Sequence, residues 1–588
     1  MKKISTLIVA LVATLSAMAQ MHGGTLKFIG NGEFYLPAMQ ETTLTQTVKD
    51  AVTVNMGSET QSFDVPSLYY AAMNMTIYSF NIPGLAFTMT GSYATGDMKF
   101  EWHGNDITTT STAPDGSTKS VTITAFSAAY DHAKGKLNMS LDFSYGSMPF
   151  PLHYAIEAYY TTDNALGLVG QGTEGNPYKI YDATDFMAIA NNISADNTFE
   201  EVYFAQMDDI DFGGTAEAPV QLPAIGKAAI TSITTVAWGF DGTYDGRFKS
   251  IKGIYHTSDA NDAAGKFNGL FSSIGTKGTV KSIVFDADNY VSSYNYVGAI
   301  ASISKGTIDH CTNNANITAT NAFAGGICGY LASGLGTIQY CENTGDIKAM
   351  TYATGIVSGS QSGTTITEYA SIVKNCTNHG NISTTNGVGS AGIAGSFSGT
   401  ITECSNDGTI DDSQGIAKTT MNTAGILSNG SYIVEVSKCN NVGAVKGSKS
   451  VGGIIGNIMK GDDANLTVSD CKNTGSVQGT GTNVGGIIGT TARTTGIITL
   501  AGCENYGLVE STGTETLIGN LRGNAAIVLS DCTIGSGLAL LPLDPGYDGV
   551  QGVSADDAAT VKNGAYVKDG RIVIVKDGNA YSVTGIKY

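Results

Sequence analysis

Apolar and polar residues alternate with a period of two along much of the first 160 residues, which predicts β-strands. The alternation is clearest in 120–126 and 136–143. Turn signals at Pro83-Gly84, Pro114-Asp115-Gly116 and Lys134-Gly135 separate the apolar runs. The expected strands are 25–29, 44–55, 68–80, 86–91, 97–103, 120–130, 136–145 and 152–160. Antiparallel strands at this spacing predict a small closed barrel or a sandwich.

A second pattern, a repeat, begins near residue 260. A Gly-Gly-aliphatic step, as in Val451-Gly-Gly-Ile-Ile-Gly456, alternates with a Cys-x-Asn-x-Gly-x-aliphatic step, as in Cys471-Lys-Asn-Thr-Gly-Ser-Val477. A period near 30 residues is typical of a stacked array, because one unit cannot bury its own apolar face. The repeated cysteines are Cys311, Cys341, Cys376, Cys404, Cys439, Cys471, Cys503 and, in a degenerate copy of the repeat, Cys532. They are separated by 30, 35, 28, 35, 32, 32 and 29 residues.

Stacking in register would turn each repeated residue type into a column. We expect the cysteines and the terminal Ile or Val of each unit to point inward. The Asn column is Asn313, Asn343, Asn378, Asn406, Asn441, Asn473 and Asn505, and its side-chain amides could bond along the stack. The glycines two residues beyond most of these asparagines are expected to supply φ > 0 at a corner.

A glycine-rich linker, 170–177, and a short helix lie between the two patterns. Asp182 or Thr184 can cap a helix whose apolar face is Phe186, Ile189 and Ile193. Such a helix would cover the first coil, whose strand edges would otherwise be open.

Composition narrows the possible partners. Among 588 residues, 32 are Lys or Arg and 51 are Asp or Glu, so the net charge is −19. This balance argues against nucleic acid and anionic membranes as partners. Lys2 and Lys3, an apolar run over 4–15 and Ala17-Met18-Ala19 are typical of a secretory signal peptide. Since no later stretch has the ~18 apolar residues of a membrane-spanning helix, we expect an exported protein, at the cell surface, extracellular or periplasmic.

Specific segments of the chain resemble known families. The motif Phe240-Asp-Gly-Thr-Tyr-Asp-Gly246, Gly269-Leu270-Phe271 and the Val-Gly-Gly-Ile-Ile-Gly copies resemble bacterial surface proteins with GLUG-type repeats. That resemblance implies a right-handed parallel β-helix and an adhesin-like role. Gly23-Gly24-Thr25-Leu26 and the strand order after it resemble the calycin-like domain of exported Bacteroidetes proteins, which implies a lipocalin-like barrel.

The expected fold is therefore all-β, with four regions. They are a signal peptide (1–19), a lipocalin/calycin-like antiparallel barrel (20–165), a right-handed parallel β-helix with a short N-terminal capping helix (170–540) and a small C-terminal β-meander (555–588). The meander either covers the last coil or is related to a C-terminal secretion and anchoring domain.

Three groups of residues leave alternatives open. The nine cysteines are either buried thiols, which one Cys per coil favours, or disulfides between coils. Asp208, Asp209, Asp211, Asp241 and Asp245 are either turn residues, which we favour, or acid–base or Ca²⁺-binding groups. Side chains either fill the barrel or enclose a small apolar ligand, in a pocket lined by Tyr69, Tyr78, Phe87, Phe126 and Phe143.

These patterns favour an exported, non-enzymatic, adhesin-like protein that binds glycan or a partner protein through the β-helix face. No catalytic, cofactor-binding or metal-binding residues are expected, because no known catalytic or phosphate-binding motif is present. The alternatives are a carrier of a small apolar ligand and a polysaccharide-active β-helix enzyme.

Overall fold

The structure is a computed structural model, and its described residues form two compact units, divided between Ile180 and Tyr181. The signal-peptide segment 1–19 lies outside the described residues. The described ranges are 25–39, 45–56, 60–90, 97–101, 106–131, 135–161, 166–233, 235–259, 266–332, 335–360, 371–413, 421–459, 466–480, 483–491, 497–510, 517–521, 526–534, 537–538, 564–568, 571–576 and 579–582.

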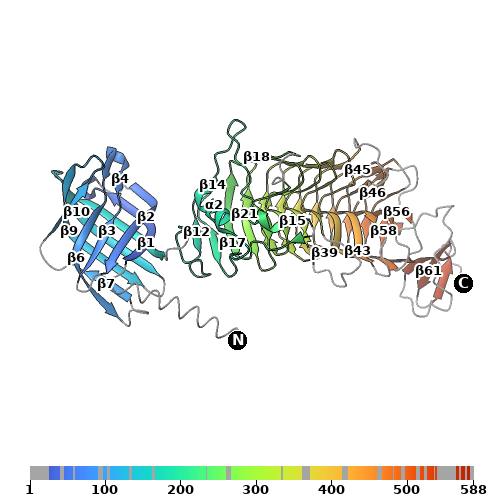
Figure 1. Cartoon of the computed structure of the whole chain (residues 1–588). Helices are drawn as coiled ribbons and strands as arrows, with labels where there is room; N and C mark the ends of the chain where they lie inside the picture. Colours follow the sequence, from blue (N-terminus) through green and yellow to red (C-terminus); the bar gives the residue numbers. More distant parts are fainter. Residues whose placement is uncertain are drawn as a thin grey trace. The chain divides into compact units, whose positions relative to one another are not determined.

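The first unit is an antiparallel, barrel-like sheet (Figure 1). Its strand order is β10-β11-β1-β2-β3-β6-β7-β9-β8, and β9 also pairs with β10, which joins the two sides of the sheet. The strands are β1 (Thr25–Tyr35), β2 (Thr45–Met56), β3 (Gln61–Val65), β6 (Phe80–Thr90), β7 (Asp97–Glu101), β8 (Ile107–Thr112), β9 (Thr118–Asp131), β10 (Lys136–Tyr145) and β11 (Leu152–Thr161).

Two details of the expected barrel strands are wrong. The segment 68–80 is not one strand but two short paired strands, β4 (Leu68–Tyr70) and β5 (Met75–Ile77), joined through a 3-10 turn. Pro83-Gly84 does not end a strand, because β6 runs through it. The register there shifts, with Gln61 opposite Leu85 but Phe63 opposite Ile82, so the extra residue forms a β-bulge.

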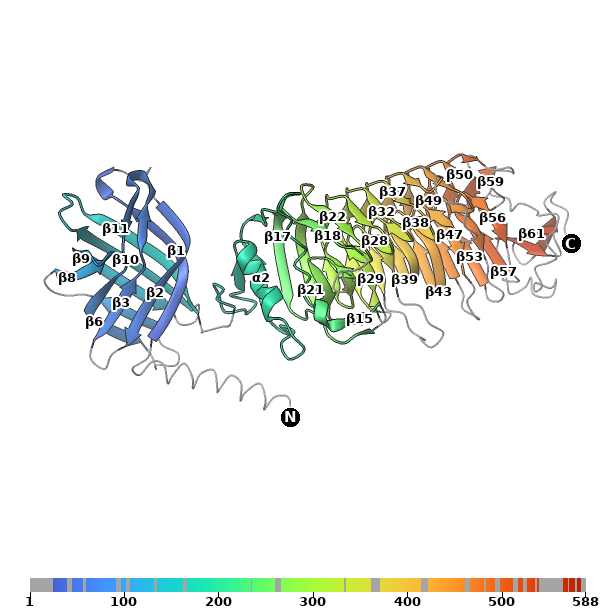
Figure 2. The same cartoon turned by 45° about the horizontal axis from the view of Figure 1, so that its top comes forward.

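The second unit is a parallel β-solenoid (Figure 2). One coil runs through five short strands, β25 (Thr307–Asp309), β26 (Thr312–Asn313), β27 (Ile317–Ala319), β28 (Phe323–Gly325) and β29 (Cys328–Leu331). Each pairs in parallel with the corresponding strand of the next coil. The solenoid predicted from the repeat is thus confirmed.

The remaining solenoid strands follow the same parallel order, except the last, which pairs antiparallel with the strand before it. They are β13 (Tyr203–Gln206), β14 (Ile210–Asp211), β17 (Thr243–Lys252), β18 (Tyr255–Thr257), β19 (Phe267–Asn268), β20 (Phe271–Ile274), β21 (Thr279–Phe285), β22 (Tyr290–Ser293), β23 (Tyr296–Gly298), β24 (Ala301–Ser304), β30 (Thr337–Gln339), β31 (Glu342–Asn343), β32 (Ile347–Ala349), β33 (Tyr352–Thr354), β34 (Val357–Gly359), β35 (Ile372–Lys374), β36 (Thr377–Asn378), β37 (Ile382–Thr384), β38 (Gly389–Ala391), β39 (Ala394–Thr402), β40 (Ser405–Asn406), β41 (Ile410–Asp411), β42 (Asn422–Ala424), β43 (Leu427–Ser437), β44 (Asn440–Asn441), β45 (Val445–Gly447), β46 (Ser450–Gly452), β47 (Ile455–Ile458), β48 (Leu466–Ser469), β49 (Lys472–Asn473), β50 (Val477–Gly479), β51 (Val484–Gly485), β52 (Ile488–Thr491), β53 (Ile497–Ala501), β54 (Glu504–Asn505), β55 (Val509–Glu510), β56 (Ile518–Leu521), β57 (Ala526–Ser530), β58 (Thr533–Ile534) and β59 (Gly537–Leu538).

A helix covers the N-terminal end of the solenoid, as predicted (Figure 2). Helix α2 (Ala183–Asn192) begins after Asp182, whose carboxylate accepts a hydrogen bond from the Asp185 backbone N–H. Its buried Phe186 packs edge-on against Tyr244 and Phe271, with ring centroids 5.3 and 6.2 Å away. The first coils therefore have an aromatic core under the helix.

The expected asparagine column is confirmed as a hydrogen-bonded ladder. Asn378 donates to the Asn406 side-chain oxygen at 2.7 Å and accepts from Asn343 at 2.7 Å. The same amide bond links each neighbouring pair from Asn313 to Asn505. Each of these seven side chains is at most 1% exposed. Each amide–amide hydrogen bond therefore takes the place of a hydrogen bond to water that the amide loses on folding.

The expectation for the glycines beyond these asparagines is wrong. None of Gly345, Gly380 and Gly408 has a positive φ. They are needed for space, because a Cβ on Gly380 would overlap the carbonyl oxygen of Gly345, and one on Gly408 would overlap that of Gly380. Positive φ is found one residue before each column cysteine, for example 50° at His310 and 52° at Lys438.

The nine cysteines are free, buried thiols, as favoured from the sequence. The Sγ of Cys341 lies 3.2 Å from the carbonyl oxygen of Gln339, and the same contact recurs at Cys376 and Cys404. Each thiol therefore satisfies a carbonyl at the corner while packing as a small apolar group. Burial raises the pKa of the Cys328 thiol to about 12.

The C-terminal segment forms the expected meander. Strand β60 (Gly564–Lys568) pairs antiparallel with β61 (Arg571–Lys576), which pairs with β62 (Asn579–Ser582). Strand β60 also pairs with β57 in the last coil. The meander thus covers a strand edge of the solenoid, which is one of the two roles considered for it.

Candidate functional site

One arc of each coil has constant length. In every copy from Cys311 to Cys503, the buried Ile or Val of the third strand lies six residues after the column cysteine. These aliphatic residues pair in register from coil to coil. The variation in repeat length, 28 to 35 residues, is therefore absorbed outside this arc.

Side chains along the arc alternate between inside and outside. The column Cys, the column Asn, the small residue two positions later and the aliphatic residue are buried, and the residues between them are exposed or half-buried. We call the outward rows the corner face. Its members are His310, Tyr340, Asn375, Glu403, Lys438 and Asp470 before the cysteines; Thr312, Glu342, Thr377, Ser405, Asn440, Lys472 and Glu504 after them; Asn314, Thr344, His379, Asp407, Val442, Thr474 and Tyr506; and Asn316, Asp346, Asn381, Thr409, Ala444, Ser476 and Leu508.

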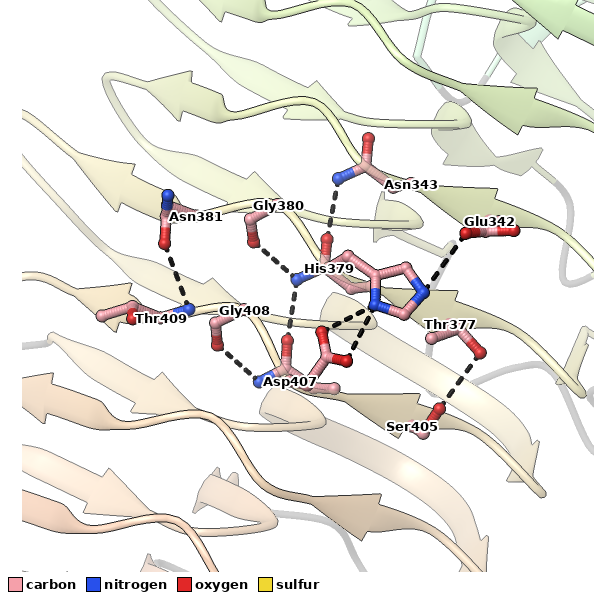
Figure 3. A network of polar contacts seen from close by, with 12 residues as sticks. Glu342, Asn343, Thr377, His379, Gly380, Asn381, Ser405, Asp407, Gly408 and Thr409 are labelled. Atoms are coloured by element: carbon pink, nitrogen blue, oxygen red, sulfur yellow. Dashed lines mark hydrogen bonds and ion pairs between the residues drawn. The ribbon is translucent and has the colours of Figure 1, made fainter.

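An imidazole joins three coils near the middle of the corner face (Figure 3). His379 Nδ1 lies 2.8 Å from both carboxylate oxygens of Asp407, and Nε2 lies 3.2 Å from Glu342 Oε1. Both ring nitrogens are engaged by carboxylates, so the ring acts as a bridge between rungs. Because all three side chains are solvent-exposed by 40% or more, each ion pair contributes at most about 1 kcal/mol.

Hydroxyl and amide groups continue this network beside the histidine. Thr377 and Ser405 share a hydrogen bond of 3.0 Å, and Asn381 accepts from the Thr409 backbone N–H at 3.3 Å (Figure 3). Asn381 also donates to Asp346 at 3.0 Å. The middle of the corner face thus presents regularly spaced polar groups that can bond a polar ligand.

Aromatic rings line the N-terminal part of the same corner. His310 stacks on Tyr340, with ring centroids 4.7 Å apart and planes 20° apart. Phe248, on β17, meets His310 edge-on at 6.5 Å. We call Phe248, His310 and Tyr340 the aromatic strip. The strip could not be predicted from the sequence, because its only signal there is that His310 and Tyr340 each precede a column cysteine.

Of the carboxylates considered from the sequence, Asp208, Asp209 and Asp241 lie between strands, whereas Asp211 lies in β14 and Asp245 in β17, so the turn prediction is wrong for these two. Asp209 accepts from the Ser250 N–H at 2.8 Å, which lowers the pKa of its carboxyl group. Asp211 accepts from the Gly213 N–H, Asp245 from the Arg247 N–H and Asp241 from the Lys277 N–H. Asp208 is exposed. Among the described residues, no group of three or more His, Cys, Asp or Glu side chains is arranged to hold a metal ion.

A buried carboxylate that the sequence did not indicate lies at the end of β41. Asp412 is 1% exposed and stands where other coils have Ala319, Ala349 or Thr384. Its oxygens accept from the Thr384 N–H and hydroxyl, both at 2.8 Å, and from the Thr423 hydroxyl at 3.2 Å. Burial raises the pKa of Asp412, and the hydrogen bonds from the threonines oppose that shift.

Replacing Asp412 by asparagine is therefore expected to stabilise the protein at neutral pH. A raised pKa means that the folded state binds the proton more tightly than the unfolded state, so wild-type stability falls as pH rises through the folded pKa. The asparagine side chain has no charge to bury and can keep the acceptor for the Thr384 N–H. Urea midpoints of both proteins should differ at pH 7 and converge near pH 4.

The neighbouring Asp411 supplies the control for this substitution. It is half-buried and accepts from the Ser413 N–H at 2.9 Å, so Asp411→Asn should not reproduce the pH-dependent gain. A gain of the Asp412→Asn protein that is equal at both pH values would contradict a charge-burial origin.

The structure describes the side chains of four of the five residues of the expected barrel pocket. Phe126 and Phe143 are buried in the core, where Phe63 lies 5.2 Å from Phe126 and Phe80 lies 5.3 Å from Phe143. Tyr69 is 47% exposed and its hydroxyl donates to Asn74. Tyr78 is half-buried. The side chain of Phe87 lies outside the described residues, and the pocket as a whole stays a prediction.

The barrel core also contains a polar pair. The hydroxyl of buried Tyr154 donates to Asp50 Oδ2 at 2.8 Å, and burial and the Asp50 carboxylate both raise the pKa of Tyr154.

A cavity of about 500 Å³ lies on the exposed side of β1, β10 and β11, where Asn31, Glu33, Asn138 and Glu157 line it.

In the part of the chain that the structure describes, no helix is long and apolar enough to cross a membrane.

Comparisons with known proteins assign no family. No family model matches the chain, so the GLUG-type and calycin-like resemblances stay predictions. Halomucin from Haloquadratum walsbyi is 29% identical over 170 residues, which are 28% of this chain and 2% of that protein. The chain thus spans only a small fraction of that curated relative. The crystal structure of a "putative immunoglobulin A1 protease" from Bacteroides ovatus aligns over 62% of this chain and 86% of its own, with 16% identity and a TM-score of 0.29. Neither similarity carries an activity over to this chain.

Proposed function

We propose that the protein is an exported, non-enzymatic, adhesin-like binding protein, of the GLUG-repeat type found in Bacteroidetes, that contacts glycan or a partner protein through the corner face. One observation carries this proposal. The corner face keeps constant length and a mostly polar outward pattern from Cys311 to Cys503, whereas the connections before and after the buried Gly-Gly step change in length. A regular, exposed array of amides, hydroxyls and carboxylates suits repeated contacts with a polymeric ligand.

The two alternatives have less support. A β-helix enzyme acting on polysaccharides needs an acid and a base that converge on one bond. On the described corner face, the carboxylates nearest a histidine are bound to that histidine. A carrier role through the barrel needs an interior space, and Phe126 and Phe143 occupy the core between β-strands.

The proposal is tested with the mature chain, residues 20–588, on an array of immobilised glycans. We expect binding to a subset of glycans, with no sugar released when the supernatant is analysed by mass spectrometry over several hours. Released sugar would overturn the non-enzymatic assignment. An array without binding would leave the partner-protein arm of the proposal, tested next by capture on extracellular matrix proteins.

A further inference from the structure

The three rings of the aromatic strip form a continuous exposed surface across four consecutive coils. Phe248 is 65% exposed, Tyr340 is 47% exposed and the His310 side chain is 47% exposed. Ser282 occupies the same corner position in the coil between Phe248 and His310. It is small and only 8% exposed, so the two rings contact each other across it. Exposed large apolar groups that adjoin one another mark interaction sites more often than single ones do.

The backbone at the strip is in a conformation that these residues disfavour. The φ angles are 58° at Phe248, 50° at His310 and 52° at Tyr340. Phe and Tyr adopt positive φ at a steric cost, whereas Gly, Asn, Asp and His adopt it more readily. In later coils the same corner position has positive φ at Asn375, Asp470, Gly502 and Asp531, and also at Glu403 and Lys438.

Packing does not offset that cost. A strained aromatic residue in a core would be compensated by burial, but these three rings face solvent. The positive φ itself belongs to the repeat, because Glu403 and Lys438 share it. The exposure of three adjoining rings is therefore the observation that indicates a ligand.

Polar groups on both sides of the rings specify the chemistry of that ligand. His310 Nδ1 lies 2.7 Å from Asp309, and Glu342 lies one residue beyond the Cys341 that follows Tyr340. Asp245 and Lys281, 3.4 Å apart, lie in the same register as Asp309. Exposed aromatic rings flanked by carboxylates suit a pyranose, whose C–H groups pack against the exposed parts of the rings while its hydroxyl groups donate to the carboxylates.

We infer that the aromatic strip is the stacking subsite for a neutral glycan chain that runs along the corner face. This inference rests on the proposed function and adds the ligand class and its position. Asp309, Glu342 and Asp407 give this side of the solenoid an acidic character, so uronic-acid and sialylated glycans are disfavoured by like charge. A peptide partner would find no described groove of unpaired backbone groups along the strip, since neighbouring coils pair there.

The test is a pair of substitutions that remove the rings without straining the backbone. Phe248→Asn and Tyr340→Asn are made together in the mature chain. Asparagine is chosen because it adopts positive φ readily. We expect unchanged or slightly higher thermal stability and about a tenfold or greater loss of affinity for neutral oligosaccharides. Cellohexaose and mannohexaose are the neutral probes, and hexagalacturonate is the acidic one, measured by calorimetry and on the glycan array.

Glu201→Asn is the matched control, because Glu201 is exposed at φ 62°, carries no ring and lies outside the corner face. It should bind neutral oligosaccharides as wild type does. If the ring variant still binds neutral glycans, the aromatic strip is not the stacking subsite, and the proposed function is unaffected. Binding confined to hexagalacturonate would overturn the ligand class. No glycan binding by wild type would overturn both the strip and the glycan arm of the proposed function. A fall in stability of the ring variant would show that the rings are structural and would also overturn the inference.

Discussion

Gly408→Ala is expected to destabilise the solenoid by about 3 kcal/mol. A Cβ at this position would overlap the backbone carbonyl of Gly380, and it would lie 2.9 Å from the Asn378 side-chain nitrogen. A carbonyl in a paired coil cannot turn aside as a flexible side chain could. Removing this overlap would require the two coils to move apart, which would weaken both the backbone hydrogen bonds and the asparagine hydrogen bonds between them. The measurement is the urea midpoint followed by circular dichroism.

Gly430→Ala is the matched control for this substitution. Gly430 also lies in the solenoid, but the nearest atoms to its Cβ would be Leu427 Cδ2 and Val434 Cγ2, both at 3.5 Å, which is ordinary contact. Its φ is not positive, so alanine there should be neutral or stabilise by about 0.5 kcal/mol through the unfolded state. Equal losses at the two positions would mean that the glycines act through flexibility rather than space.

The columns of the solenoid could be predicted because repetition makes each residue type an independent observation. A single Cys or Asn says little, but seven copies at one position predict an inward column and a ladder. The conformation of the corner could not be predicted in this way. The residue before each cysteine varies among His310, Tyr340, Asn375, Glu403 and Lys438, so no residue preference reveals its positive φ.

The barrel shows a different limit. Strands with strict alternation, such as β10 (Lys136–Tyr145), were predicted to the residue. Strands β3 and β8 were not predicted, since β3 is short and β8 is mostly threonine. Pro83-Gly84 predicts a turn, but local chemistry cannot distinguish a turn from a bulge. Pairing with β3 decides between them, and it depends on residues that are distant in sequence.

The candidate site was only partly predictable for the same reason. The sequence favoured the β-helix face as the binding surface, but the site residues it named were in the barrel. The aromatic strip combines Phe248, before the first recognisable repeat, with His310 and Tyr340 in two later coils. Only the parallel register brings these rings into one line.

Asn406→Ala is expected to cost about 4 kcal/mol, the largest effect of any substitution proposed. The Asn406 amide donates to the Gly408 carbonyl at 2.9 Å and to Asn441 Oδ1 at 2.8 Å, and it accepts from Asn378 at 2.7 Å. Alanine would leave an amide hydrogen of Asn378 and the side-chain oxygen of Asn441 without these partners. Both groups are fully buried, and each buried polar group without a partner costs about 1–3 kcal/mol.

The end of the ladder supplies the control that separates this effect from loss of volume. Asn505 accepts from Asn473 at 2.7 Å, but the residue paired with it in the next coil is Ile534, which has no amide. Asn505→Ala deletes the same atoms from an equally buried position and leaves only one neighbouring side chain unpaired, so about half the loss is expected. The urea midpoints of both variants distinguish loss of hydrogen bonds from loss of volume. Equal losses would mean that the asparagines act mainly by filling space, because only a ladder distinguishes its middle from its end.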